Sequence, residues 1–321
     1  PDGPLHYLPF AALRVDSKRY LAEVKPIAQA VSATVYAELA KAGRGEKEPI
    51  RLVAFGDPAY PGKEHLEYLG GTVRYATRIA DLSPLPSTRH EIEGLKALYE
   101  DAGIFLGEWA TEEEAKRLGK EVPLIHFACH GIVDERFPLD SGLALTIPEK
   151  AEEGKDNGLW QAWEIFEKLR IDATLVTLSA CETGLGKEMG GEGLIGLTRA
   201  FQYAGARSVL SSLWSVSDES TAELMKRFYG YLKEGKPKAE ALRLAQMEMI
   251  RGEVQGGLLA SPQSLQHDAG RPQRAAPTPT EDLQSRRGGA PTDPPASPLT
   301  PPPDWSHPFY WAAFVLNGDG G

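Results

Sequence analysis

A cysteine and a histidine each follow a short apolar run of this 321-residue chain and stand beside glycine-containing loops. Cys181 ends the run LVTLSAC, which starts at Leu175, and His130 ends the run VPLIHFACH, which starts at Val122 and is followed by Gly131. Both runs are typical of buried strands, because they are short, rich in branched apolar residues and end at small residues. The sequence therefore predicts a thiol and an imidazole at the carboxyl ends of two strands.

These two side chains could carry out acyl transfer if their strands are neighbours. Parallel strands of an α/β sheet place their carboxyl ends along one edge, where such folds build their binding sites. A nearby imidazole favours the reactive thiolate and can donate a proton to the departing amine. We therefore predict that Cys181 is a nucleophile, that His130 is its acid or base, and that the reaction is peptide hydrolysis.

Glycine beside the histidine suits the same chemistry. A tetrahedral acyl intermediate needs backbone donors aimed at its oxyanion, and a glycine lets the substrate approach the chain closely. The amide of Gly131 is the best candidate donor, with the amide of Cys181 beside it. The alternative is that the turn alone requires a glycine here, and this requirement is compatible with the catalytic role.

At these residues the chain resembles the CHAT proteins, relatives of caspases and separase whose Cys and His dyad stands at the ends of two sheet strands. The matching blocks run in family order and cover nearly the whole chain except the segment around 252–305. They are HFACHG (126–131), SGLAL (141–145), LSACETGLG (178–186), the long block at 191–221 and HPFYWAAFVLNGD (307–319), with weaker similarity at 5–13 and 55–58.

The resemblance implies a three-layer, caspase-like α/β sandwich with a mostly parallel central sheet and helices on both faces. It also implies a cysteine endopeptidase that acts on a protein or peptide substrate and is controlled by a regulatory partner or an upstream helical-repeat region. We expect one CHAT domain over 1–321, forming the C-terminal part of a longer protein. The competing hypothesis is a non-catalytic interaction or signalling domain on the same fold.

Two acidic residues are candidates for binding the substrate. Asp218 follows the predicted strand 207–213, and two interpretations of it stand side by side. One places it in the amino-terminal cap of a helix. The other, which the resemblance to separase implies, places it in a pocket for Arg or Lys before the scissile bond, and a capped helix does not exclude this role. Glu192, in the glycine-rich stretch after Cys181, is a second candidate.

Other residues of these stretches have structural interpretations. We expect Cys129 to be a small buried residue on the opposite face of the strand from His130. Strand alternation predicts that His126 points to the same face as His130, deeper in the sheet, as a structural or supporting group. A zinc site from His126, His130 and Cys181 lacks a fourth ligand, so we predict neither a metal nor a cofactor.

The spacing of Gly191, Gly193 and Gly196 matches the GxGxxG pattern of dinucleotide-binding loops. In such folds the loop follows its strand directly, whereas here a dozen residues intervene. The apolar spacing of the residues that follow predicts a helix that ends near Gly205.

An excess of acidic residues excludes two classes of partner. The 35 Lys and Arg against 45 Asp and Glu give a formal charge of −10. Because nucleic-acid and anionic-membrane binders need a basic surface, we expect neither nucleic acid nor membrane as a direct partner. The sequence shows no signal peptide and no apolar run of bilayer length, so we expect a cytoplasmic protein.

Strands and helices are predicted to alternate in a three-layer α/β pattern. The segment 252–303 is dense in Pro, Ser, Thr and Gln, and we expect a disordered insertion, with RPQR (271–274) and SRRGG (285–289) as hypothetical self-cleavage sites. The predicted strands are near 51–55, 124–128, 143–146, 174–179, 207–213 and 311–316, and the predicted helices near 89–101, 111–119, 193–204, 218–234 and 237–251.

Overall fold

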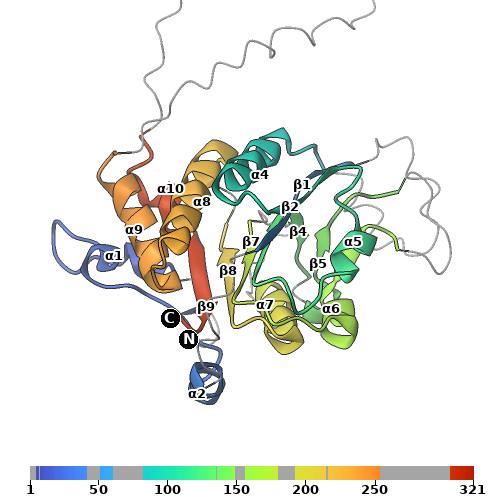
Figure 1. Ribbon diagram of the computed structural model, residues 1–321. Coiled ribbons are helices and arrows are strands. Elements are labelled where there is room, and N and C mark those ends of the chain that lie inside the picture. Colours follow the sequence, from blue (N-terminus) through green and yellow to red (C-terminus); the bar gives the residue numbers. More distant parts are fainter. Residues whose placement is uncertain are drawn as a thin grey trace, which may run out of the picture. The chain divides into compact units, whose positions relative to one another are not determined.

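Six strands from distant parts of the chain form the central sheet (Figure 1). They lie in the order β2, β1, β3, β7, β8, β9, and all neighbours are parallel except β9, which runs antiparallel to β8. This confirms the predicted, mostly parallel sheet. The strands are β1 (Leu52–Pro58), β2 (Gly103–Gly107), β3 (Leu124–Ala128), β7 (Leu175–Leu178), β8 (Ser208–Ser212) and β9 (Phe314–Gly318).

In the computed structural model, all the residues that can be described belong to one structural unit. The described residues are 5–6, 8–41, 51–60, 82–134, 136–148, 156–179, 192–214, 216–253 and 304–321, without the side chains of 39–41, 192–194 and 218. The predicted insertion at 252–303 lies outside them except for its first two residues, as do both hypothetical cleavage sites.

Helices cover both faces of this sheet, which gives the predicted three layers (Figure 1). Alternate residues of β3 divide between the two cores: Leu124 and Ala128 pack with one helical layer, and Ile125 and Phe127 pack with the other. All four are buried, which explains why the strand is apolar except for His126. The first layer is α4 (Pro86–Leu98), α8 (Asp218–Lys233) and α9 (Lys238–Ile250), and the second is α5 (Glu112–Lys116), α6 (Ala162–Lys168) and α7 (Glu192–Ala204).

A second, smaller sheet begins immediately after β3. It is antiparallel, in the order β4 (His130–Ile132), β5 (Gly142–Ala144), β6 (Leu159–Gln161). Only Cys129 separates the last residue of β3 from the first residue of β4, so the chain passes from one sheet to the other at His130. The sequence predicted β5 but neither β4 nor β6, because three-residue strands are too short to show a period.

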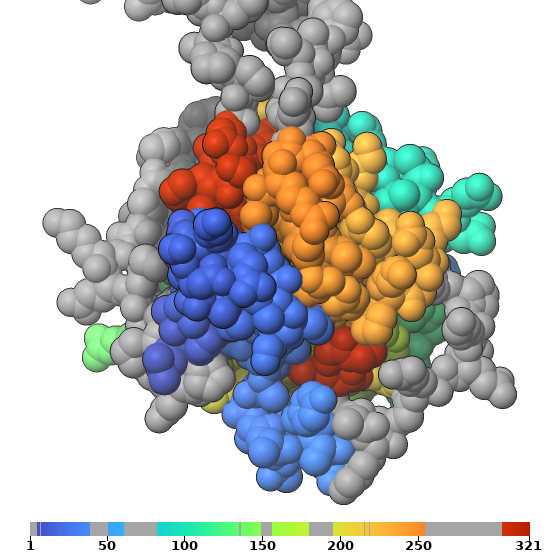
Figure 2. All heavy atoms as spheres, turned by 90° about the vertical axis from the view of Figure 1, so that its left-hand side faces the viewer, coloured from blue at the N-terminus to red at the C-terminus, as the bar shows by residue number. Residues whose placement is uncertain are grey.

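The first described residues pack at the far edge of the large sheet. They include a 3₁₀ turn η2 (Phe10–Ala12) and the helices α1 (Leu21–Val24) and α2 (Ala33–Lys41). Figure 2 shows these residues in blue beside α9 in orange. The Gln29 amide donates to the Leu316 carbonyl at 2.8 Å, and the Gly318 amide donates to the Gln29 carbonyl at 2.7 Å. Backbone hydrogen bonds therefore continue the sheet beyond β9.

Two glycines, one within helix α7 and one directly after it, have packing roles. Gly205, directly after the helix, has φ +121°, and a Cβ there would lie 1.8 Å from the Ile171 carbonyl oxygen. At Gly196 a Cβ would lie 2.6 Å from the carbonyl oxygen of Pro138, in the 3₁₀ turn η4 (Pro138–Asp140). Close packing therefore explains Gly196 of the GxGxxG pattern; Gly191 lies outside the described residues.

The strand predicted at 311–316 is wrong in its first half. Residues Pro308–Trp311 form the short helix α10, and β9 begins only at Phe314. The helix starts there because Pro308 occupies the first helical position and the His307 ring nitrogen Nδ1 accepts from the Phe309 amide at 3.2 Å. Among the described helices, none combines the length and apolar composition required to cross a bilayer.

Candidate active site

The strands β1, β3, β7 and β8 all end at one edge of the large sheet, which we call the carboxyl edge. β3 and β7 are direct neighbours, with Phe127 opposite Leu178. His130 follows β3 at this edge, and Cys181 comes three residues after the end of β7 but lies outside the described residues. The predicted adjacency of the two strands is confirmed, and the approach of the two side chains stays a prediction.

The His130 imidazole is oriented by a backbone carbonyl. The residue is only 4% exposed, and its Nε2 is 2.7 Å from the Ser83 carbonyl oxygen. A carbonyl can only accept a hydrogen bond, so Nε2 carries the proton. In the neutral ring, Nδ1 is then the nitrogen with the lone pair, which is the form required of a base acting through Nδ1.

A tyrosine from the end of β1 contacts the same histidine. The ring centroids of Tyr60 and His130 are 5.2 Å apart, and the two rings are tilted by 46°. The Tyr60 hydroxyl accepts from the His130 amide at 3.3 Å and donates to the Ala144 carbonyl at 2.8 Å. Burial raises the pKa of Tyr60 well above its ordinary value, so the phenol stays neutral.

The segments that supply Tyr60 and Ser83 are tied to each other. Asp57 has φ +46°, in the left-handed region that non-glycine residues rarely adopt. Its amide donates to Thr88 Oγ1 at 2.8 Å, and Nε and Nη2 of Arg89 both lie 2.8 Å from its Oδ2. These bonds fasten the end of β1 to the first turns of α4, which follow Ser83 in the chain.

The neighbours of His130 in sequence take different roles. Cys129 is 1% exposed and packs in the core beneath α6 and α7, and burial raises the pKa of its thiol. Its surroundings fit the predicted structural role, because an inert buried thiol is a small apolar residue. Gly131 lies in β4 opposite Leu143 and is buried; its predicted role toward an oxyanion stays a prediction.

His126 belongs to a buried polar network below the carboxyl edge. Its Nε2 is 2.8 Å from Glu91 Oε1 in α4, and its Nδ1 is 3.1 Å from the Tyr229 hydroxyl in α8, which donates to Thr177 Oγ1 at 2.9 Å. The network joins β3 and β7 to the helices above them, which supports the structural interpretation of His126. The strand ends at Ala128, so the alternation expected between His126 and His130 does not extend along one strand.

The two predicted acidic residues both begin helices. Asp218 is the first residue of α8, after the N-cap Ser217, and it follows β8 at the carboxyl edge. The helical interpretation of this residue is therefore confirmed for its backbone. Glu192 is the first residue of α7. The side chains of Asp218 and Glu192 lie outside the described residues, so their contacts with a substrate stay predictions.

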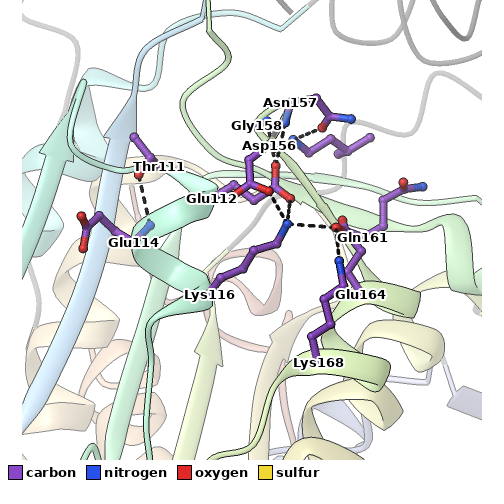
Figure 3. A network of polar contacts seen from close by, with 11 residues as sticks. Thr111, Glu112, Glu114, Lys116, Asp156, Asn157, Gly158, Gln161, Glu164 and Lys168 are labelled. Atoms are coloured by element: carbon purple, nitrogen blue, oxygen red, sulfur yellow. Dashed lines mark hydrogen bonds and ion pairs between the residues drawn. The ribbon is translucent and has the colours of Figure 1, made fainter. Parts of the chain in front are cut away.

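A second polar cluster lies on the α5 and α6 side of the molecule (Figure 3). Lys116 Nζ is 2.6 Å from Glu112, 2.5 Å from Asp156 and 3.0 Å from Glu164. Glu112 Oε2 also accepts the amides of Asn157, at 3.1 Å, and Gly158, at 2.8 Å. We call Glu112, Lys116, Asp156 and Glu164 the Lys116 cluster.

Contacts within the Lys116 cluster oppose the effect of burial on the pKa values of Glu112 and Lys116. Burial raises the pKa of Glu112, and the hydrogen bond from Lys116 opposes that shift. Burial lowers the pKa of Lys116, but its bonds to Asp156, Glu112 and Glu164 outweigh this and raise that pKa above its ordinary value. These groups join α5, the approach to β6 and α6, which is a structural role.

Sequence reasoning missed the two described groups that contact His130, Ser83 and Tyr60. Ser83 acts through its backbone carbonyl, so its side-chain type carries no signal. Tyr60 had a weak signal, since it is an aromatic residue two positions after a strand that ends at the predicted site edge. Only the fold reveals that these residues, far apart in sequence, meet at one imidazole.

A model of the CHAT domain family matches residues 1–319. The chain belongs to the CHAT domain family. Tetratricopeptide repeat protein 28 is 26% identical to it over 269 residues in Mus musculus and 26% identical over 276 residues in Homo sapiens. These matches cover 73% and 75% of the chain, which spans only 10% of the length of either relative.

Two solved structures also resemble this CHAT domain. One is the Saccharomyces cerevisiae separase–securin complex, with TM-score 0.43 and 13% identity over 75% of this chain and 13% of that one. The other is the Arg-specific cysteine proteinase gingipain R, with TM-score 0.38 and 9% identity over 84% of this chain and 46% of that one. The assignment to the CHAT family depends on neither of them.

Proposed function

We propose that this CHAT domain is a cysteine endopeptidase in which Cys181 is the nucleophile and His130 the acid and base. The observation that carries the proposal is the orientation of His130. Its Nε2 is held 2.7 Å from the Ser83 carbonyl at the carboxyl edge, beside the strand that leads to Cys181. A fixed tautomer at this edge is what proton transfer through Nδ1 requires.

The reaction follows from these roles. The Cys181 thiolate attacks the carbonyl carbon of the scissile peptide, and the amides of Gly131 and Cys181 stabilise the oxyanion. The tetrahedral intermediate collapses when the nitrogen of the leaving amine takes a proton from His130. Water then attacks the thioester and gives a proton to His130, and the thiolate leaves to complete the cycle. The products are a carboxylic acid and an amine.

Substrate choice is assigned to groups at the same edge. Asp218, which begins α8 after β8, would pair with an Arg or Lys side chain before the scissile bond, with Glu192 as a second acid. The substrate is a protein or peptide. A regulatory partner or an upstream helical-repeat region would control access, and the tetratricopeptide repeat relatives are compatible with this arrangement. A cytoplasmic location stays a prediction.

The first experiment is covalent labelling with an Arg-directed acyloxymethyl ketone, read by intact mass and peptide mapping. Wild-type protein should gain one adduct on Cys181, Cys181→Ala should gain none, and His130→Ala should react much more slowly. Cys129 is the internal control. It should stay unlabelled in the folded protein, because it is 1% exposed and its thiol pKa is raised by burial.

The remaining outcomes separate the parts of the proposal. Labelling of Cys181 only by a probe that carries a different residue would remove the role of Asp218 and keep the peptidase. Failure of every probe to label Cys181 faster than Cys129, with candidate partner proteins present, would overturn the peptidase. It would favour the non-catalytic interaction domain on the same fold.

A further inference from the structure

The Tyr60 hydroxyl is hydrogen-bonded to two neighbouring strands of the small sheet. His130 of β4 stands opposite Ala144 of β5 in the antiparallel register. The hydroxyl lies between them, accepting from the His130 amide and donating to the Ala144 carbonyl, at 3.3 Å and 2.8 Å. It thus satisfies a donor and an acceptor that face each other across the two strands.

The two hydrogen bonds of the Tyr60 hydroxyl lie at the start of β4, which carries His130. His130 is the first residue of the small sheet, and Cys129 alone connects it to β3 of the large sheet. A one-residue connection does not fix the direction of the next side chain, so that direction depends on how the start of β4 is held. The described contacts at this start include the Tyr60 hydroxyl on the amide and the Ser83 carbonyl on the ring.

The backbone that carries Tyr60 is itself firmly placed. The Ala59 amide donates to Thr146 Oγ1 at 3.1 Å, and the Ile147 amide donates to the Ala59 carbonyl at 3.0 Å. Asp57, with its left-handed backbone, lies at an irregular step of the pairing near the end of β1 and is bound to α4 through Arg89. A left-handed backbone at a non-glycine residue is strained and persists only where surrounding contacts impose it.

We propose that Tyr60 is a positioning residue for His130. This inference rests on the proposed role of His130 in peptide hydrolysis and deepens it. The two contacts act together, since the Ser83 carbonyl selects which ring nitrogen carries the proton, and Tyr60 holds the start of β4 so that the ring stays aligned with that carbonyl. Tyr60 acts through its neutral hydroxyl and takes no part in proton transfer.

The test compares wild type with Tyr60→Phe, which removes one oxygen and keeps the ring. Three quantities are measured, namely exchange of the His130 amide by NMR, the tautomer of the His130 imidazole by nitrogen NMR, and the rate of Cys181 labelling. We expect about fivefold faster amide exchange, from the loss of one hydrogen bond. We also expect a mixture of tautomers and about tenfold slower labelling, since small displacements of a catalytic group are costly.

Tyr99→Phe is the matched control. The Tyr99 phenol is also buried and also donates to a backbone carbonyl, that of Tyr229 at 3.0 Å, but its hydroxyl is bonded to α8 and not to His130. Its removal should lower the melting temperature and leave all three His130 readouts at the wild-type values. Thermal melts of both variants establish that they fold.

The outcomes distinguish this inference from the proposed function. If Tyr60→Phe leaves amide exchange and tautomer unchanged, or if Tyr99→Phe changes them equally, the positioning role is overturned whatever the labelling shows. If Tyr60→Phe changes both NMR readouts while wild-type Cys181 reacts with no probe, the hydroxyl positions His130 and the peptidase is wrong. A change in all three readouts, restricted to Tyr60→Phe, supports both.

Discussion

Two polar clusters of this CHAT domain hold an ionisable group in opposite ways. The contacts of His130 that the structure describes include two neutral partners, a backbone carbonyl on its ring and a phenol on its amide. Lys116 is surrounded by the carboxylates of Glu112, Asp156 and Glu164 (Figure 3). Neutral partners orient a ring without fixing its charge, whereas three carboxylates hold the ammonium in its charged form. The first arrangement suits proton transfer, and the second suits structural support.

The comparison predicts that replacements at the two clusters affect different properties. Replacement of His130 should change turnover strongly and the free energy of unfolding little. Replacement of Lys116 should lower the free energy of unfolding and leave Cys181 labelling near its wild-type rate. The following predictions run from the largest effect to the smallest.

His130→Ala should reduce turnover of an Arg-containing peptide by about 10²–10⁴-fold, because a positioned acid and base contributes that much. The free energy of unfolding should fall by only about 1–2 kcal/mol, from the lost hydrogen bond to Ser83. Steady-state kinetics and urea unfolding measure the two quantities. A large loss of stability with little loss of turnover would place His130 with the structural residues.

Lys116→Met should lower the free energy of unfolding by about 2–3 kcal/mol. It leaves Glu112, whose side chain is 3% exposed, without its cation, and this cost falls below the 3–5 kcal/mol of a fully buried pair. Urea unfolding measures it, and Cys181 labelling well below the melting temperature should keep its rate. The control is Lys168→Met, since Lys168 is 60% exposed and 3.9 Å from Glu164, and it should change stability by less than about 0.5 kcal/mol.

Tyr229→Phe should lower the free energy of unfolding by about 1–3 kcal/mol, because it leaves buried polar atoms of His126 and Thr177 without their common partner. Thermal unfolding at neutral pH measures this change. Tyr203→Phe serves as the surface comparison, since Tyr203 is 60% exposed. Equal melting temperatures for the two variants would contradict a stabilising role for the His126 network.

Arg243→Gln tests an ion pair outside both clusters. The hydrogen bond from Arg243 lowers the pKa of Glu240 below its ordinary value of 4.5. A lowered carboxyl pKa contributes stability above the unfolded pKa, and this contribution is lost as the pH falls through the folded pKa. The variant should therefore be about 0.3–0.5 kcal/mol less stable at pH 7 and equal to wild type near pH 3. A difference that persists at pH 3 would show another cause.

The sequence predicted the elements whose patterns are long or continuous. β3 and β7 were recognisable because both are buried on two faces and are apolar apart from His126 and Thr177, and α7 and α8 because their apolar residues recur at helical spacing. The helix at 308–311 was missed because its aromatic residues read as the start of a strand, although Pro308 and His307 form a local helix start. Three-residue strands such as β4 carry too few residues to show any period.

Only part of the candidate site could be predicted from the sequence, and the reason is physical. His130 could be predicted because its side chain can transfer protons and because it stands next to a strand end. The groups that orient it are a backbone carbonyl at Ser83 and a hydroxyl at Tyr60, 47 and 70 residues away in sequence. In the Lys116 cluster, Lys116 likewise contacts Glu164, which is 48 positions away in sequence. Such partners are selected by tertiary packing, which local spacing does not encode.

The passage of the chain from one sheet to the other at Cys129 has a mechanical consequence. The imidazole is mounted on the small sheet, while the segment that leads to Cys181 leaves the large one. The two sheets are coupled by more than this joint, since Leu143 of β5 and Trp160 of β6 share one hydrophobic core with Phe127 of β3. The position of the imidazole relative to the large sheet is therefore transmitted through side-chain packing as well as through the one-residue connection at Cys129.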